Sequence, residues 1–465
     1  MERPNAWKNY TKRELKALET LNQGYMDFLS KGKTERLCVQ LAEEMARQHG
    51  YVELGELIAG KKKLKAGDKV YAVCMKKTIV MFQIGKKPLE NGMNILGAHI
   101  DSPRLDVKQN PLYEDTDIAY LDTHYYGGIK KWQWVTIPLA IYGVIVKKDG
   151  TVVEVAIGDK EEDPVFCVSD LLIHLAGEQQ EKKASKVVEA ENLDILFGTI
   201  PLQKEEKDAV KKNVLAILKE QYDMEEEDFL SAELEVVPAG RARECGIDRS
   251  MVMSYGQDDR VCAYTSLVAM LEVEKPEVTS CCLLVDKEEI GSVGATGMQS
   301  KFFENTVAEL IALTGTYSDL KLKRCLANSS MLSSDVNAAY DPLYASAFEK
   351  KNASYMGRGL VFSKFTGRGG KSGSNDANAE YMGRIRRIMD DSKVAFQTAE
   401  LGKVDVGGGG TIAYIMSLYG MEVIDSGVAV LNMHAPWEIT SKADVYEAKK
   451  GYVAFLKSSA PYISR

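Results

Sequence analysis

Residues 281–298 read CCLLVDKEEIGSVGATGM, an apolar run that ends in a charged cluster followed by glycines. The apolar run predicts a buried strand, because an uninterrupted apolar stretch of this length is typical of one. Glu288 and Glu289 follow at its end, where adjacent carboxylates are costly unless a cation lies near them. An isolated acid pair is usually a solvated strand end. The alternative is that one acid is a metal ligand and the other a proton-transfer base.

Other predicted strands end in imidazoles and carboxylates of the same kind. These residues are His99 and Asp101 after NILGA, Asp258 and Asp259 after MVMSYGQ, Asp335 after SSMLSS, and His434 after VAVLNM. Each has an ordinary structural explanation when taken alone, such as a core histidine, a helix start or an N-cap. Together, these imidazole and carboxylate groups are suitable ligands for zinc, cobalt or manganese. About five such ligands would suit two metal ions with one ligand bridging them. The HxD spacing would let Asp101 orient the imidazole of His99.

The remaining candidates are weaker. His174 lies in LLIHLAG, which predicts a helix face packed in the core, and His49 is predicted to lie at the surface. Lys371 lies in the glycine-rich stretch 367–374, GRGGKSGS, where a solvated loop lysine and an anion contact are both open. A phosphate-binding loop is excluded there, because the GxxxxGK[ST] spacing is absent.

Composition narrows the class of protein. The chain has 465 residues, 45% hydrophobic and 27% charged, which predicts a globular protein of two domains. The net charge of −8 argues against nucleic acid as a partner, and no apolar run is long enough to span a bilayer. The N-terminus lacks the apolar core of a signal peptide, and eight scattered cysteines without CxxC favour reduced thiols. We therefore expect a cytoplasmic protein.

The order of predicted elements indicates an α/β protein interrupted by an insertion. Helices are predicted at 11–30, 35–49, 169–176, 204–222, 260–273, 301–313, 376–389, 411–418 and 442–457, and strands at 69–75, 78–84, 93–100, 280–285, 394–398 and 422–432. Between about 109 and 237, aromatic and β-branched segments dominate. The prediction is a discontinuous α/β domain, 1–107 and 240–465, split by a β-rich domain, 108–239.

Five blocks in this order carry a resemblance to a known family: GAHIDSPRLDVK, YGQDDRVCAYTSL, VDKEEIGSVGATG, SSDVNAAYDP and NMHAPWEITSKAD. They resemble the aspartyl aminopeptidase and vacuolar aminopeptidase I family of dinuclear zinc exopeptidases over nearly the whole chain. The resemblance implies a mixed-sheet, three-layer catalytic domain with an inserted β-rich dimerisation domain. It also implies a large homo-oligomer, a tetrahedral dodecamer built from dimers, that acts on peptides.

The resemblance also implies roles for individual residues. His99 and Asp335 would hold one zinc ion, Glu289 and His434 the other, and Asp258 would bridge the two. Glu288 would be the general base and Asp101 the acid that orients His99, while His174 and Lys371 match substrate-contacting residues. Asn337 and Ala338 stand where aspartyl-type members carry histidines, so the preferred N-terminal residue is left as acidic or neutral.

The resulting hypothesis is a metal-dependent aminopeptidase that removes the N-terminal residue of peptides with a metal-activated water. A dipeptidase or aminoacylase on the same dinuclear architecture is the alternative. A non-catalytic scaffold is a further alternative, although no candidate ligand is missing from the sequence.

Overall fold

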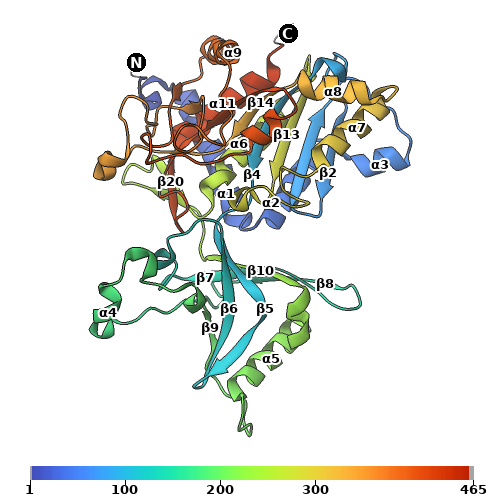
Figure 1. Cartoon of the computed structure of the whole chain (residues 1–465). Helices are drawn as coiled ribbons and strands as arrows, with labels where there is room; N and C mark the ends of the chain where they lie inside the picture. Colours follow the sequence, from blue (N-terminus) through green and yellow to red (C-terminus); the bar gives the residue numbers. More distant parts are fainter. Residues whose placement is uncertain (1–2, 460–465) are drawn as a thin grey trace. The chain divides into compact units, whose positions relative to one another are not determined.

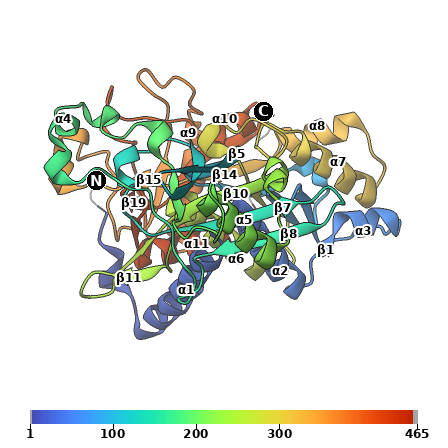
Figure 2. The ribbon, with the colours of Figure 1, turned by 90° about the horizontal axis from the view of Figure 1, so that it is seen from below.

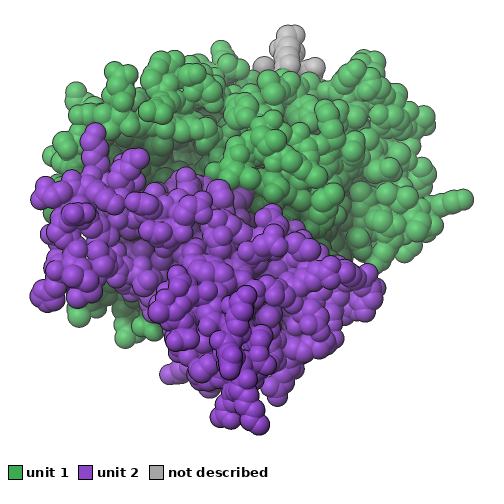
Figure 3. Space-filling model, turned by 60° about the horizontal axis from the view of Figure 1, so that its bottom comes forward, with its two compact units in different colours: residues 1–101, 242–433, 438–465 green, residues 102–241, 434–437 purple. Residues whose placement is uncertain are grey.

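The structure is a computed structural model that describes residues 3–459 of the chain (Figure 1). It divides into two compact units, which Figure 3 shows in separate colours. Unit 1 comprises residues 1–101, 242–433 and 438–465, and unit 2 comprises residues 102–241 and 434–437. Each unit is built around a sheet of its own.

Unit 1 is organised by a mixed sheet of nine strands in the order β1-β2-β3-β13-β4-β14-β18-β16-β17. Their bounds are β1 Val52–Glu53, β2 Lys69–Cys74, β3 Thr78–Gln83, β13 Thr279–Val285, β4 Met93–His99, β14 Ser330–Ser334, β18 Glu422–Gly427, β16 Leu360–Ser363 and β17 Phe396–Thr398. The central strands β13, β4, β14 and β18 run parallel, whereas β3 and β16 run antiparallel to their neighbours β13 and β18. β13 is buried along its whole length, as its apolar sequence predicts.

Helices cover both faces of this sheet and form two hydrophobic cores. One core contains apolar residues of α1 (Lys12–Lys31), α2 (Glu35–Gln48), α6 (Gln257–Glu272), α9 (Ala379–Asp391) and α11 (Lys442–Lys457). The other contains residues of α3 (Leu54–Ala59), α7 (Phe302–Thr314), α8 (Asp319–Ala327) and α10 (Ala413–Ser417). This arrangement confirms the predicted three-layer α/β class.

A smaller five-stranded sheet also belongs to unit 1, in the order β11-β12-β20-β19-β15. Its strands are β11 Arg243–Cys245, β12 Met251–Ser254, β20 Glu438–Ser441, β19 Ala429–Leu431 and β15 Asn337–Ala338. The predicted strand 422–432 is therefore two strands, β18 and β19, which belong to different sheets. Gly427, at the end of β18, marks the point where the chain passes from one sheet to the other.

Unit 2 is β-rich, with an antiparallel sheet in the order β8-β7-β10-β5-β6-β9. Its strands are β5 Arg104–Asp115, β6 Ile118–Tyr126, β7 Leu139–Val146, β8 Val152–Ile157, β9 Ile195–Gly198 and β10 Ala232–Pro238. Helix α5 (Ala209–Tyr222) packs on β5, β6 and β9 (Figure 1). Figure 2 shows the same ribbon from below. α5 begins later than the predicted 204–222.

The segment between β8 and β9 differs most from the sequence prediction. A helix over 169–176 is wrong: this stretch has only the 3₁₀ turn Ile173–Leu175, followed by the short helix α4, Gly177–Gln180. The apolar side chains of 171–175 are exposed, for example 64% for Ile173 and 67% for Leu175. The apolar stretch LLIHLAG therefore does not form a buried helix face here.

Two predictions about the chain's chemistry agree with the structure. None of the eight cysteines forms a disulfide bond, and five of them, Cys38, Cys262, Cys281, Cys282 and Cys325, are buried. Thr11 and Glu14 form the predicted capping box at the start of α1.

Within residues 3–459, no helix is both long and apolar enough to cross a membrane.

The close packing at Gly427 gives a testable prediction. A Cβ on Gly427 would fall well inside van der Waals contact with the backbone carbonyl of Asp335, at the end of β14. Neither backbone can move without disturbing the sheet, so we expect Gly427→Ala to cost about 2–3 kcal/mol or more of unfolding free energy. The measurement is urea-induced unfolding of the two proteins.

The matched control is Gly383→Ala in α9, where a Cβ would meet nothing within 4 Å. Glycine is unfavourable inside a helix, so this variant should be unchanged or more stable by about 0.5–1 kcal/mol. Equal stability of Gly427→Ala and the wild type would contradict the packing argument.

Candidate metal centre

The site lies where three neighbouring parallel strands of unit 1 end. In the order β13-β4-β14, Val285 of β13 pairs with His99 of β4, so the carboxyl ends of these strands meet at one edge of the sheet. The last residue of β4, His99, is thereby brought together with Glu288 and Asp335, which follow β13 and β14. Ligand sites in open α/β sheets commonly occupy this edge.

The imidazole of His99 stands at the centre of the cluster, and its side chain is only 2% exposed. Its Nε2 atom lies 3.2 Å from Oδ1 of Asp258, 3.8 Å from Oδ1 of Asp335 and 3.9 Å from Oε2 of Glu288. Its Nδ1 atom faces Asp101, 3.0 Å from the backbone carbonyl and 3.3 Å from Oδ1. One ring nitrogen is therefore oriented by Asp101, and the other is directed at three carboxylates.

The turn that carries Glu288 and Glu289 is held by the same Asp101. The backbone N–H groups of Glu288 and Glu289 donate to the two carboxylate oxygens of Asp101, both at 3.1 Å. Gly291 closes this 3₁₀ turn with φ +95°, a left-handed conformation that glycine adopts without steric cost. Asp101 thus fixes the imidazole and the acid pair relative to each other.

Asp258 reaches the cluster from a helix start instead of from the nine-stranded sheet. It lies in the first turn of α6 with non-helical dihedral angles, and its peptide bond to Asp259 is cis. Its backbone N–H donates to Glu438 Oε2 at 3.0 Å. Gln257 donates through Nε2 to the carbonyls of Val252 and Glu438, which anchors the turn. Gln257 and Glu438 were not predicted as part of the site, although an acid four residues after His434 is visible in the MHAPWE motif.

Burial and crowding shift the acid–base equilibria of the cluster. Burial by itself would lower the pKa of His99, but hydrogen bonds to Asp101, Asp258 and Asp335 raise that pKa well above its usual range. Burial also raises the pKa of Glu288 to about 8, although His99 opposes the shift. The pKa of Asp335 is raised by burial as well. Buried and half-buried carboxylates thus share one imidazole, a charge distribution that divalent cations would stabilise.

The donor atoms fit a metal ion by their spacing and chemistry. His99, Asp258 and Asp335 offer ligand atoms that all lie within 4.8 Å of one another, as do His99, Glu288 and Glu289. Imidazole nitrogen and carboxylate oxygen together suit zinc and related ions. Within residues 3–459, the only groups of this kind are built from the predicted site residues.

The remaining predictions concern three histidines and one lysine, His434, His174, His49 and Lys371. His434 follows β19, has φ +65° and belongs to unit 2, where its Nδ1 lies 2.8 Å from the carbonyl of Gly128. His174 is exposed in the 3₁₀ turn of unit 2, so the prediction that it packs in a core is wrong. Lys371 contacts Asp376 at 3.0 Å and lies over the ring of Phe365, both of them near it in sequence. His49 is exposed, as predicted.

A further buried acid, Asp425 on β18, gives a prediction for the pH dependence of stability. Burial raises the pKa of Asp425 to about 7, although a hydrogen bond from Thr411 opposes the shift. A carboxyl group with a raised pKa in the folded state is favourable below its unfolded pKa of about 4. That contribution is lost as the pH rises towards 7. Asp425→Asn removes the titration, so the change in unfolding free energy between pH 5 and pH 8 should shrink by a few kcal/mol.

The measurement is urea-induced unfolding of the wild type and Asp425→Asn, both with metal bound, at the two pH values. Any pH dependence of metal binding is common to both proteins and cancels in the comparison. An identical pH dependence in the two proteins would contradict the buried ionisation of Asp425.

The imidazole–carboxylate cluster at the strand ends of this three-layer fold suits a divalent metal ion, as in metal-dependent hydrolases. Comparison with known proteins makes the class more specific. Residues 28–456 match the family described as aminopeptidase I zinc metalloprotease (M18). The chain belongs to this family and is a metal-dependent aminopeptidase.

Individual relatives agree with this assignment. The chain is 62% identical over 458 residues to a probable M18 family aminopeptidase 1 of Clostridium acetobutylicum, covering 98% of each chain. It resembles the crystal structure of an M18 aminopeptidase from Thermotoga maritima with a TM-score of 0.94 and 46% identity, over 98% of this chain and 99% of that one. The yeast mApe1 dodecamer, at 21% identity, shares the fold with a TM-score of 0.74 over 94% and 96% of the two chains.

Proposed function

We propose that the chain removes the N-terminal residue from peptides at a centre of two divalent metal ions, with zinc as the resident metal and cobalt or manganese able to replace it. The observation that carries this proposal is the arrangement around His99. A single buried imidazole faces Asp258, Asp335 and Glu288 within 3.9 Å. Membership of a zinc metalloprotease family supports the choice of metal.

The proposed ligands follow the geometry and the family resemblance together. His99 and Asp335 would hold one ion, Glu289 and His434 the other, and Asp258 would bridge them. Ions held there would polarise a carbonyl oxygen and lower the pKa of a nearby water towards neutrality. Asp101 would serve as the positioning residue, because it receives hydrogen bonds from the turn and faces Nδ1 of His99.

Glu288 is the proposed general base. It takes the proton of the attacking water and passes it to the nitrogen of the departing amine, so that the peptide bond is hydrolysed with the proton conserved. Burial raises the pKa of Glu288 to about 8 in the protein without metal, and cations nearby would lower it. A pKa close to the working pH suits a group that first accepts and then donates a proton.

The negative charge of the centre also provides a reason for exopeptidase specificity. The free α-ammonium group of a peptide is cationic, and the carboxylates around the centre would attract it. An internal peptide bond offers no such group. His174 and Lys371 remain proposed substrate contacts on the basis of the family resemblance.

We also propose a homo-oligomer built from dimers, in a tetrahedral dodecamer. The exposed apolar side chains of 171–175 favour coverage by another copy of the chain, because such patches mark interfaces. The structural relative from yeast is a dodecamer. Eight cysteines without a disulfide bond are consistent with a reducing compartment, so we propose the cytoplasm.

A substrate panel tests the proposed function. Aminoacyl substrates with Asp, Glu, Leu or Met at the first position are compared with an N-acetylated control. We expect cleavage of free-amine substrates only, and the preferred residue distinguishes acidic from neutral specificity. Cleavage of the acetylated control alone would indicate an aminoacylase, and cleavage restricted to dipeptides would indicate a dipeptidase.

A further inference from the structure

One cavity of unit 1 has charged lining residues that are all basic. Its volume is about 840 Å³, within the ~300–1,000 Å³ range of small-molecule sites. The basic side chains are Arg3, Lys350, Lys351, Arg358 and Arg386. The chain as a whole has a net charge of −8, so its composition does not explain this gathering. We call it the basic cavity.

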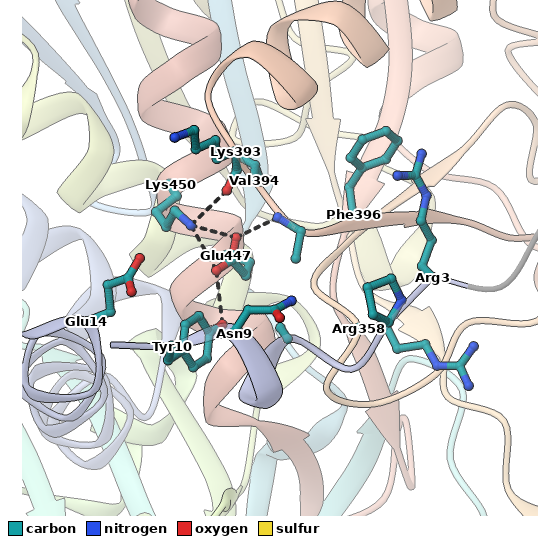
Figure 4. Close-up of a pocket in the computed structure, with 13 residues that line it drawn as sticks. Arg3, Asn9, Tyr10, Glu14, Arg358, Lys393, Val394, Phe396, Glu447 and Lys450 are labelled. Carbon is teal, nitrogen blue, oxygen red and sulfur yellow. Dashed lines mark hydrogen bonds and ion pairs between the residues drawn. The ribbon is translucent and has the colours of Figure 1, made fainter. Parts of the chain in front are cut away.

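Aromatic rings hold two of the guanidinium groups in place. Arg358 lies over the ring of Tyr355 at 4.3 Å, and Arg3 lies over the ring of Phe396 at 4.2 Å. Figure 4 shows Arg3, Arg358 and Phe396 grouped on one side of the neighbouring pocket, which shares these three residues with the basic cavity. A guanidinium stacked through its face keeps its N–H edge available for an oxyanion.

The backbone around Arg358 is fixed by a buried carboxylate. The N–H groups of Gly357 and Gly359 donate to the two oxygens of Asp444, at 2.8 and 2.7 Å. Both glycines have positive φ, +77° and +88°. A Cβ at Gly359 would overlap the carbonyl of Ala395. These contacts restrict the backbone conformation of the loop, and Arg358 lies between the two restrained glycines.

The ring beneath Arg358 is fixed in a similar way. The buried side chain of Gln397 accepts from the N–H of Tyr355 at 2.9 Å and donates to the carbonyl of Tyr355 at 2.8 Å. The hydroxyl of Tyr355 donates to the carbonyl of Lys350 at 2.8 Å. Arg358, Tyr355 and Lys350 thus form a preorganised group, and preorganisation reduces the entropy lost on binding.

The positive charge of the cavity is only partly compensated: the lining carries no acidic side chain, and Glu349 interacts with Lys351 from outside it. Among residues 3–459, Lys350, Lys351, Arg358 and Arg386 form no ion pair with a carboxylate. Arg3 has Asp390 at 4.0 Å. Five cations with so few counter-charges repel one another, so an anion in the cavity would relieve that repulsion.

We propose that the basic cavity binds a small multivalent oxyanion, with phosphate groups as the best match. Guanidinium edges bind phosphate and carboxylate oxygens in pairs, and several fixed cations favour a ligand with more than one charged group. The cavity size favours a small molecule. This site is independent of the metal centre and of the proposed peptidase chemistry.

The test uses the metal-loaded, full-length protein and isothermal titration with inorganic pyrophosphate, with citrate as a second titrant. The main variant is Arg386→Gln, an exposed position on α9 whose substitution should not affect folding. The matched control is Arg387→Gln, the next residue of the same helix, which is exposed and does not line the cavity. Arg358→Gln tests the anchored cation.

We expect pyrophosphate to bind about tenfold or more weakly to Arg386→Gln and Arg358→Gln, and unchanged to Arg387→Gln. The same pattern with citrate but not pyrophosphate would make carboxylates the ligand chemistry and overturn the phosphate preference. Equal binding to all variants would place the anion elsewhere, for example at the metal centre, and overturn the proposal. Absence of binding to the wild type would overturn it as well.

Discussion

Glu288→Gln is expected to lower kcat by about 10²–10⁴-fold while the metal content remains that of the wild type. The amide is nearly the same size as the carboxylate but cannot accept the proton of the attacking water. The Glu288 backbone N–H still donates to Asp101, so the turn keeps its shape. Steady-state kinetics and metal analysis of the same preparation measure both effects.

The control for this variant is Glu309→Gln, an exposed glutamate on α7. It makes the same chemical change away from the cluster and should leave kcat unaltered. Near-full activity of Glu288→Gln would show that another group accepts the proton. Loss of metal in Glu288→Gln would show that Glu288 is a ligand instead of the base.

Asp258→Ala is expected to lose both metal and activity. Substitution of residues that only orient metal ligands costs about 10–100-fold in metal affinity, and removal of the proposed bridging ligand should cost more. A metal present at 100 times its Kd stabilises a protein by about 2.7 kcal/mol. Added zinc should therefore raise the Tm of the wild type and leave the Tm of Asp258→Ala unchanged.

The matched control is Asp391→Ala at the exposed end of α9, which should bind zinc and respond to it like the wild type. Metal analysis after gel filtration and thermal unfolding with and without zinc give the two measurements. Full metal content in Asp258→Ala would contradict the bridging role of Asp258.

Part of the candidate site could be predicted from sequence because its residues follow strands. The apolar runs before His99, Glu288 and Asp335 identify three strand ends, and the parallel order β13-β4-β14 brings those ends together. The order itself could not be predicted, because it depends on crossovers between strands that are distant in sequence. Asp258 arrives from a helix start next to a different sheet.

Buried acids outside the motifs were not predicted, for a physical reason. Asp425 and Asp444 are buried, yet aspartate in a sequence usually indicates the surface. Their partners, Thr411 for Asp425 and two glycine N–H groups for Asp444, become apparent only in three dimensions. The spacing of residues in the sequence does not predict such contacts.

The fold was predicted best where local signals and burial agree. The capping box at Thr11 and the apolar run of β13 both gave elements that the structure contains. The stretch LLIHLAG misled the prediction, because apolar residues that remain exposed in one chain look like core residues in its sequence. A sequence pattern identifies apolar residues, but it does not identify the surface, in the same chain or in a partner, that buries them.

The most direct test of the central claim is titration of the metal-free enzyme with zinc while hydrolysis of a free-amine substrate is followed. The metal is first removed with a chelator, which is then removed from the protein. We predict no activity without metal and recovery that is complete at two zinc ions per chain. Full activity in the metal-free protein, or complete recovery at one ion per chain, would contradict a dinuclear centre at His99, Asp258, Glu289, Asp335 and His434.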